Sequence, residues 1–245
     1  MSMIVLRVTA RQLLSRRRSL LLIVFALLPI LLAVIYRLGE HRFGPRGWLT
    51  ETLYADLIIT TLLPLAALVL GTAALGAEID DGTAFYLLAK PISRSSIVFA
   101  KLAVVAASVS MLAFFTTLVS GAIVLDGLGT ERIVVGFSAA VVVGSVLYSA
   151  VFILLSIVTS RALVVGLGYV LIWEGLISGL FSGTRVFSVR QYTLGVADTI
   201  STVPKFVFEA QLNTTTTIAF GTLAGIFAVS FAIRRLEAFQ AGETT

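Results

Sequence analysis

The sequence predicts an all-α membrane protein with six transmembrane helices, and three observations support this prediction. Of the 245 residues, 58% are hydrophobic and only 13% are charged, whereas a soluble domain carries about 25% charged residues. The charges are segregated, because Glu174 is the sole charged residue in six long apolar segments, 19–36, 57–77, 102–125, 133–160, 162–184 and 210–233. Each segment is close to the roughly 20 residues that a helix needs to cross a bilayer. A soluble enzyme, a disordered chain and a nucleic-acid-binding domain are therefore excluded.

The six spans are expected to be helices rather than barrel strands. Both structures satisfy their backbone hydrogen bonds in lipid, but barrel strands would alternate apolar and polar residues, which these segments do not. Pro29 and Pro64 lie inside the first two spans and are expected to kink them. We expect spans over residues 19–38, 57–77, 96–125, 133–158, 162–184 and 213–235.

The connections between the spans differ in length. Residues 37–56 are expected to form an outer loop, residues 125–132 a short outer turn, and residues 159–161 a very tight inner turn. Residues 185–209 form the longest outer connection and mix apolar with charged side chains. This mixture predicts short interfacial helices that cap the outer mouth of the protein.

Basic residues near both ends of the chain predict its orientation. Arg16, Arg17 and Arg18 precede the first span, and Arg234 and Arg235 follow the last. Cytoplasmic termini place 11 of the 18 Lys and Arg residues on the inner side, in agreement with the positive-inside rule. We therefore interpret the net charge of +5 as a topology signal.

Residues 1–18 form a candidate interfacial helix. Arg7 and Arg11 would share one helical face, and Leu13 would lie roughly opposite them. Such a helix can lie in the headgroup layer with its basic side toward anionic lipid. A plain basic tail that only sets the topology is the alternative.

The inner loop between the second and third spans contains the most informative motif. The residues before Pro91 can form a short helix, which the proline should end, and Ser93 or Ser95 can cap the next helix. Side chains such as Asp81 and Phe85 would then be exposed at the cytoplasmic surface. An aromatic side chain in that position needs a partner surface or the lipid interface.

This loop resembles the first cytoplasmic loop of the type-2 ABC transporter permeases. In that family a Glu, a Gly-Thr pair, a Leu-Leu pair, a Pro-x-Ser-Arg sequence and a Lys follow one another between the second and third spans. The family also has an N-terminal interfacial helix, six spans, cytoplasmic termini and a re-entrant outer segment before the last span. The matching loop positions here are Glu78, Gly82, Thr83, Leu87, Leu88, Pro91, Ser93, Arg94 and Lys101.

The resemblance implies the fold and the function of a type-2 ABC exporter permease in a prokaryotic cell membrane. Residues 78–92 would form a coupling helix that docks in a groove of a separate ATP-binding subunit, present in two copies. A second permease chain, identical or paralogous, would complete the transporter. The sequence contains no Gly-x-x-x-x-Gly-Lys-Ser/Thr loop. ATP and Mg²⁺ would therefore be bound by the partner ATPase, and this chain would need no cofactor.

Glu174 lies near the centre of the fifth span, next to Trp173. A carboxylate at that depth costs roughly 2.5–3.5 kcal/mol on insertion scales, so it should face protein or a wet cavity, or be protonated. One interpretation places both residues in the translocation path or a gate. The other makes Glu174 a carboxyl group hydrogen-bonded between helices. Its partners are expected among serines or threonines of neighbouring spans or in the second protomer.

Glycines recur at intervals of four residues in the last two spans. Small residues on one helix face allow helices to approach closely in lipid. The resemblance favours a contact between protomers at these positions, and packing within one chain is the alternative. The glycines are Gly175, Gly179 and Gly183 in the fifth span and Gly221 and Gly225 in the sixth.

Two other classes of membrane protein are less consistent with the sequence. A small secondary transporter usually carries several charges inside the membrane, whereas this chain has one. A membrane scaffold that works without an ATPase is the other alternative. A phosphotransferase motif beginning at Asp81 lacks its arginine and its later aspartates. The single histidine and the absence of cysteine exclude thiolate and multi-histidine metal sites.

Overall fold

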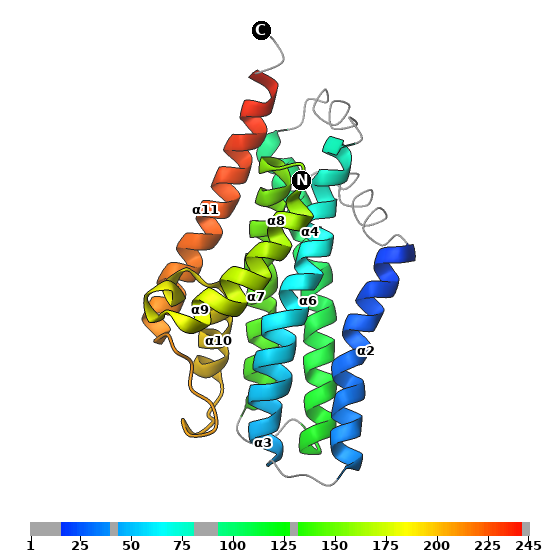
Figure 1. Ribbon diagram of the computed structural model, residues 1–245, viewed down its shortest axis with the longest axis vertical. Helices are drawn as coiled ribbons and strands as arrows, with labels where there is room; N and C mark the ends of the chain where they lie inside the picture. Colours follow the sequence, from blue (N-terminus) through cyan, green and yellow to red (C-terminus); the bar gives the residue numbers. More distant parts are fainter. Residues whose placement is uncertain (1–15, 40–43, 81–92, 128–131, 242–245) are drawn as a thin grey trace.

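The computed structural model describes residues 16–39, 44–80, 93–127 and 132–241, and the regular elements among them are helical (Figure 1). Six helices are long and apolar enough to cross a membrane, as predicted. The long elements are α2 (Arg16–Leu38), α4 (Leu63–Asp80), α6 (Arg94–Leu125), α7 (Ile133–Val158) and α11 (Thr214–Ala241). The short ones are α3 (Pro45–Gly47), η1 (Trp48–Leu62), α8 (Ala162–Gly168), η2 (Tyr169–Ile177), α9 (Ser178–Leu180), η3 (Ser182–Phe187) and α10 (Val189–Ile200).

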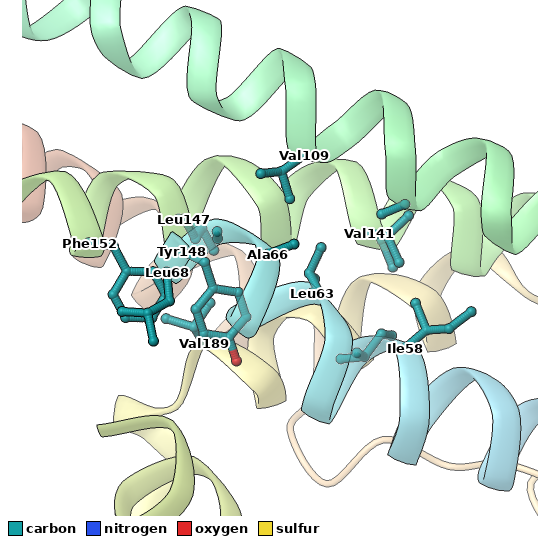
Figure 2. Close-up of a cluster of buried hydrophobic side chains, with 14 of the residues drawn as sticks. Ile58, Leu63, Ala66, Leu68, Val109, Val141, Leu147, Tyr148, Phe152 and Val189 are labelled. Carbon is teal, nitrogen blue, oxygen red and sulfur yellow. The ribbon is translucent and has the colours of Figure 1, made fainter. Parts of the chain in front are cut away.

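The second and fourth spans form the centre of the bundle. Their apolar windows are each 61% buried, whereas those of the first, fifth and sixth spans are 17–22% buried. Figure 2 shows Leu63 and Ala66 of α4 facing Val141 of α7, with Val109 of α6 beside them. The first, fifth and sixth spans therefore present most of their apolar side chains outward, toward lipid or another chain.

The second span is longer at its outer end than we predicted. Helical structure begins at Pro45, so part of the outer loop expected over residues 37–56 is helix. Pro45 occupies the first helical turn, which suits proline because its missing N–H is not needed there. Trp48 stacks on Tyr36 with ring centroids 4.1 Å apart and holds the start of this helix against α2. The length of the apolar segment did not predict residues 45–56 as helix, because a helix tolerates charged residues once it leaves the hydrocarbon.

Pro64 marks a change of helical register and not simply a kink. The preceding element, η1, is a π-helix, and its last backbone bond runs from the Leu63 amide to the Ile58 carbonyl. The hydroxyl of Thr60 donates to the Ala55 carbonyl at 2.6 Å, also five residues back. Proline lacks the N–H that would extend either register, so the chain can pass from π-helix to α-helix here.

The remaining boundaries differ from the predictions by small amounts. The third span begins at Arg94 rather than residue 96, and the last runs to Ala241 rather than residue 235. The fifth span ends at Leu180, and residues 182–187 form a 3₁₀-helix. Asp126 and Gly127, at the start of the predicted outer turn, adopt positive φ angles of 55° and 134° after α6, and residues 128–131 of that turn lie outside the described residues. The predicted interfacial helix, with Arg7, Arg11 and Leu13, lies outside the described residues.

The outer connection contains a helix that is packed inside the protein, which corrects the expectation of interfacial helices over residues 185–209. Helix α10 contacts α7 and α11 (Figure 1). Its buried residues include Thr193, Gly195 and Ala197. The prediction failed because the segment's mixed composition is typical of an interface, but it also suits a short helix that packs against α7 and α11.

Gly121 provides a test of the packing between η1 and α6. A Cβ atom there would lie 2.0 Å from the Tyr54 hydroxyl, which donates to the Thr117 carbonyl at 2.6 Å. We expect Gly121→Leu to lower stability by about 2–3 kcal/mol, because it overpacks this contact and disrupts a buried hydrogen bond. Gly168→Leu is the control, since no atom lies within 4 Å of its Cβ position. Equal melting temperatures of the two variants in detergent would contradict this packing.

Candidate functional site

Glu174 is fully buried in η2, at 0% exposure, and its carboxylate is surrounded by hydrogen-bond donors. The Tyr169 hydroxyl donates to Oε1 at 2.7 Å, and the Val189 amide donates to the same atom at 2.8 Å. The Ser188 hydroxyl donates to Oε2. Both oxygens are therefore satisfied within one chain, so the geometry matches the interpretation of a carboxyl group hydrogen-bonded between segments.

The partners of Glu174 are not those we expected. The hydrogen bonds given by the described residues come from its own helix and from the start of α10. Ser188 is the N-cap of α10, and its hydroxyl accepts a hydrogen bond from the Gln191 amide. The N-terminus of a helix favours negative charge because its amides are unpaired and its dipole is positive there. The carboxylate thus completes the cap of a helix that packs inside the bundle.

Arg190, two residues after this cap, extends the connection to the second span. The Arg190 guanidinium lies 3.5 Å from the Asp56 carboxylate on η1, and the arginine side chain is 19% exposed. Three consecutive residues, Ser188, Val189 and Arg190, therefore join α10 to both the fifth and the second spans.

Close contacts hold the rest of α10 against α7 and α11. A Cβ atom on Gly144 of α7 would lie 2.6 Å from the Thr193 hydroxyl, and one on Gly195 would lie 2.2 Å from the Thr217 hydroxyl of α11. Any larger residue at either glycine would push α10 away from its neighbours. Small residues serve the same purpose where helices meet inside lipid.

The repeated glycines fall into two groups. Gly221 lies against the Tyr192 ring, with a closest Cβ contact of 3.5 Å, and Gly225 lies against Leu147 at 3.1 Å, so both pack within the chain. Gly179 and Gly183 have no atom within 4 Å of their Cβ positions, and Gly175 has only one, a carbonyl oxygen at 3.5 Å. The fifth-span glycines are therefore open, and Gly183 lies in the 3₁₀-helix rather than in the span.

Trp173, the neighbour of Glu174, is half-buried and points toward the outer segment. Its indole Nε1 donates to the Phe187 carbonyl at 3.2 Å. The side chain thus adds a second connection between the fifth span and the residues that precede α10. Like Glu174, it contacts the chain's own backbone.

The residues predicted to couple to an ATPase are only partly described. Ser93 is the N-cap of α6, Arg94 is half-buried in its first turn, and Glu78 belongs to the last turn of α4. Lys101 is 1% exposed, and its ammonium donates to the Ala74 carbonyl of α4. It therefore connects the two helices that flank the loop. Asp81, Gly82, Thr83, Phe85, Leu87, Leu88 and Pro91 lie outside the described residues.

The site includes residues that our sequence reasoning missed, namely Asp56 and the Ser188–Arg190 tripeptide. One signal could have identified the tripeptide. Ser188 and Gln191 have the Ser-x-x-Gln spacing of a capping box, which predicts a helix start at this point. The partnership with Glu174 had no comparable signal, because pairing across 14 or 15 residues depends on the tertiary fold.

Replacing Glu174 tests whether it supports α10. Glu174→Ala would leave the Val189 amide and two hydroxyls without their acceptor, so we expect stability to fall by about 2–4 kcal/mol, measured by thermal unfolding in detergent. Glu174→Gln keeps one acceptor and should lose about half as much. Trp173→Phe, which removes a more exposed hydrogen bond, is the control. Normal stability of Glu174→Ala together with lost transport would instead indicate contact with the substrate.

Comparison with known proteins identifies the family of this chain. Residues 13–177, more than half of the sequence, match the family described as ABC-2 family transporter protein. The matched region includes the inner-loop motif, η1 and all of η2. No curated protein sequence matches the chain. The chain is a multi-pass membrane protein that belongs to the ABC-2 family of transporter membrane proteins.

Proposed function

We propose that this chain is the permease subunit of an ATP-driven exporter, and that it works with two separate ATPase subunits and a second permease chain. The observation that supports this proposal is the family match over residues 13–177. A membrane component of an ABC transporter implies an ATPase partner and is generally not itself catalytic. Family membership leaves the alternative, an ATPase-independent scaffold or secondary transporter, without support.

The described helices support an inner-loop coupling element. Helix α4 ends and α6 begins at the same end of the bundle, near the last turns of α11 (Figure 1). Lys101 connects α6 to α4 near that end through the Ala74 carbonyl. A force on residues 78–92 would therefore act on both helices together. The positive-inside rule places this end, and both termini, in the cytoplasm.

The contacts around α10 suggest how such a force reaches the opposite half of the protein. Helices α4 and η1 form one continuous element that leads from the inner loop to Asp56. Asp56 pairs with Arg190, and the adjacent Val189 amide binds Glu174 of the fifth span. Movement of the second span is thus coupled to α10 and the fifth span. Coupled transport then requires that the two arrangements differ in their affinity for substrate.

A second permease chain is proposed to pack against the fifth span. Apolar side chains along α8 and η2, such as Leu163, Leu171 and Leu176, are more than half exposed. The open glycines at positions 175 and 179 lie on the same span and would allow another helix to approach closely. The last-span glycines already pack within the chain and are not part of this proposal.

The coupling proposal predicts different effects at the two ends of the bundle. We expect Gly82→Trp to abolish co-purification of an ATPase in mild detergent, or to uncouple ATP hydrolysis from transport, because it adds bulk to the proposed docking segment. Arg94→Glu should act in the same direction. Gly44→Trp is the matched control, since it lies in the opposite loop with no atom within 4 Å of its Cβ position. Undiminished ATPase binding and transport in both inner-loop variants would refute the coupling role.

The dimer proposal predicts a change in association without a change in folding. Gly179→Leu adds a side chain where the chain itself has open space, so the melting temperature of the monomer should not fall. The fraction of dimer, measured by cross-linking or by mass in detergent, should fall roughly tenfold if the side chain blocks the interface. An unchanged dimer fraction would place the interface elsewhere.

A further inference from the structure

An apolar groove lies between α2 and α6, on a side of the bundle that the proposed coupling and dimer contacts do not use. Its volume is about 470 Å³, within the range of about 300–1,000 Å³ that is typical of ligand sites. Helix α2 contributes Leu22, Ile23, Ala26 and Ile30, and α6 contributes Ser108, Met111, Leu112, Phe115, Thr116 and Val119. The groove is thus bounded by two transmembrane helices at the depth of the hydrocarbon.

Helix α2 packs against α6 along a narrow face, and the groove lies beside that contact. Between residues 20 and 38, only Leu22, Pro29 and Ala33 are buried. Across the groove, Met111 and Phe115 of α6 are 65% and 52% exposed. The helices are held together at their outer ends by the Arg37–Asp126 ion pair.

The lining favours a hydrocarbon occupant over a polar one. All but two of its residues are apolar, and one of those two, Ser108, donates its hydroxyl to the Val104 carbonyl of its own helix at 2.8 Å. A polar ligand would have little to bind there. Water would be equally poorly accommodated, because a bound water needs two to four polar partners.

The length of the groove suits an extended acyl chain. From Leu22 to Ile30 it follows α2 for about 12 Å, between apolar side chains of both helices. A helix of another chain is the competing occupant, and the test below distinguishes the two.

The sequence at the inner end of the groove supplies the complementary charge for a headgroup. Arg16, Arg17 and Arg18 form the first turn of α2, and Leu22, the first groove residue on this helix, follows one turn later. Basic residues next to a span attract the anionic lipids of the cytoplasmic leaflet. The apolar groove and the basic turn therefore follow one another along α2 in the same order as the acyl tail and the headgroup of a phospholipid.

We propose that the groove between α2 and α6 binds an acyl chain of an anionic inner-leaflet phospholipid, whose headgroup lies at Arg16–Arg18. The lipid fills the space that α2 leaves beside the bundle and stabilises the position of this helix. It is a bound component of the membrane, and neither its chemistry nor its place depends on the identity of the transported substrate.

The test compares lipid retention by variants of the full chain in nanodiscs of equimolar phosphatidylglycerol and phosphatidylcholine. Because both leaflets have the same composition, the result does not depend on the orientation of the protein. Native mass spectrometry after disruption of the nanodisc should show phosphatidylglycerol retained by the unaltered chain in preference to phosphatidylcholine. Retention that follows the nanodisc composition would mean ordinary surrounding lipid and would overturn the proposal.

Variants on one helix then locate the site. Ala26→Trp fills the groove and should lower retention roughly tenfold, whereas Leu27→Trp, on the outward face, should leave it unchanged. If the tryptophan variant does not fold, Ala26→Leu, a smaller change, is used in its place and should also lower retention. Retention by both Ala26 variants equal to that of the unaltered chain would overturn the proposal. So would a shift in the monomer–dimer ratio of the Ala26 variants, which would identify the groove as a protomer interface.

A separate variant tests the assignment of the headgroup to the basic turn of α2. Replacing Arg16, Arg17 and Arg18 together by glutamine leaves the groove intact, so retention of phosphatidylcholine should stay the same while the preference for phosphatidylglycerol is lost. A preserved preference would overturn the assignment of the headgroup to this turn.

Discussion

The structure depends on the pairing of the Glu174 carboxylate with the N-terminus of α10. Each partner would be unfavourable alone, because a carboxylate at the centre of a span costs roughly 2.5–3.5 kcal/mol and a buried, unpaired amide costs about 1–3 kcal/mol. Together they satisfy one another through the Val189 amide and the Ser188 hydroxyl. This pairing explains how a helix of only 12 residues, with buried Gln191 and Thr193, is accommodated in the protein.

The close packing around α10 follows from the same constraint. In lipid, helix association gains little from the hydrophobic effect, so it depends on van der Waals contact and interhelical hydrogen bonds. Gly144 and Gly195 permit the contacts that bring Thr193 and Thr217 against neighbouring helices. The polar cap at one end of α10 and the glycine contacts along its length are therefore two parts of one arrangement that positions the helix between α7 and α11.

The sequence predicted the six spans well, but it predicted the hydrogen-bond donors of Glu174 and the location of α10 poorly, for different physical reasons. Segregation of charge is a direct consequence of the hydrocarbon, so six spans follow from composition alone. The limits of the second span were wrong because a helix can continue into the headgroup layer, where residues such as Asp56 are tolerated. Glu174 was identifiable as unusual from its position, but its donors, and the buried location of α10, arise from tertiary contacts between segments that composition does not relate.

The two sides of the bundle are held by different kinds of contact. On one side, Glu174 joins the fifth span to α10 through buried hydrogen bonds, and Arg190 joins α10 to the second span through an ion pair in which the Asp56 side chain is 70% exposed. On the other side, α2 buries few residues and leaves a groove beside α6. A displacement of the second span would therefore reach α10 and the fifth span through polar contacts, and would reach α2 through its packing against α6 and the Tyr36–Trp48 stack. Lipid in the proposed groove would fill the space beside that packing, because hydrocarbon occupies an irregular space without demanding a fixed set of partners.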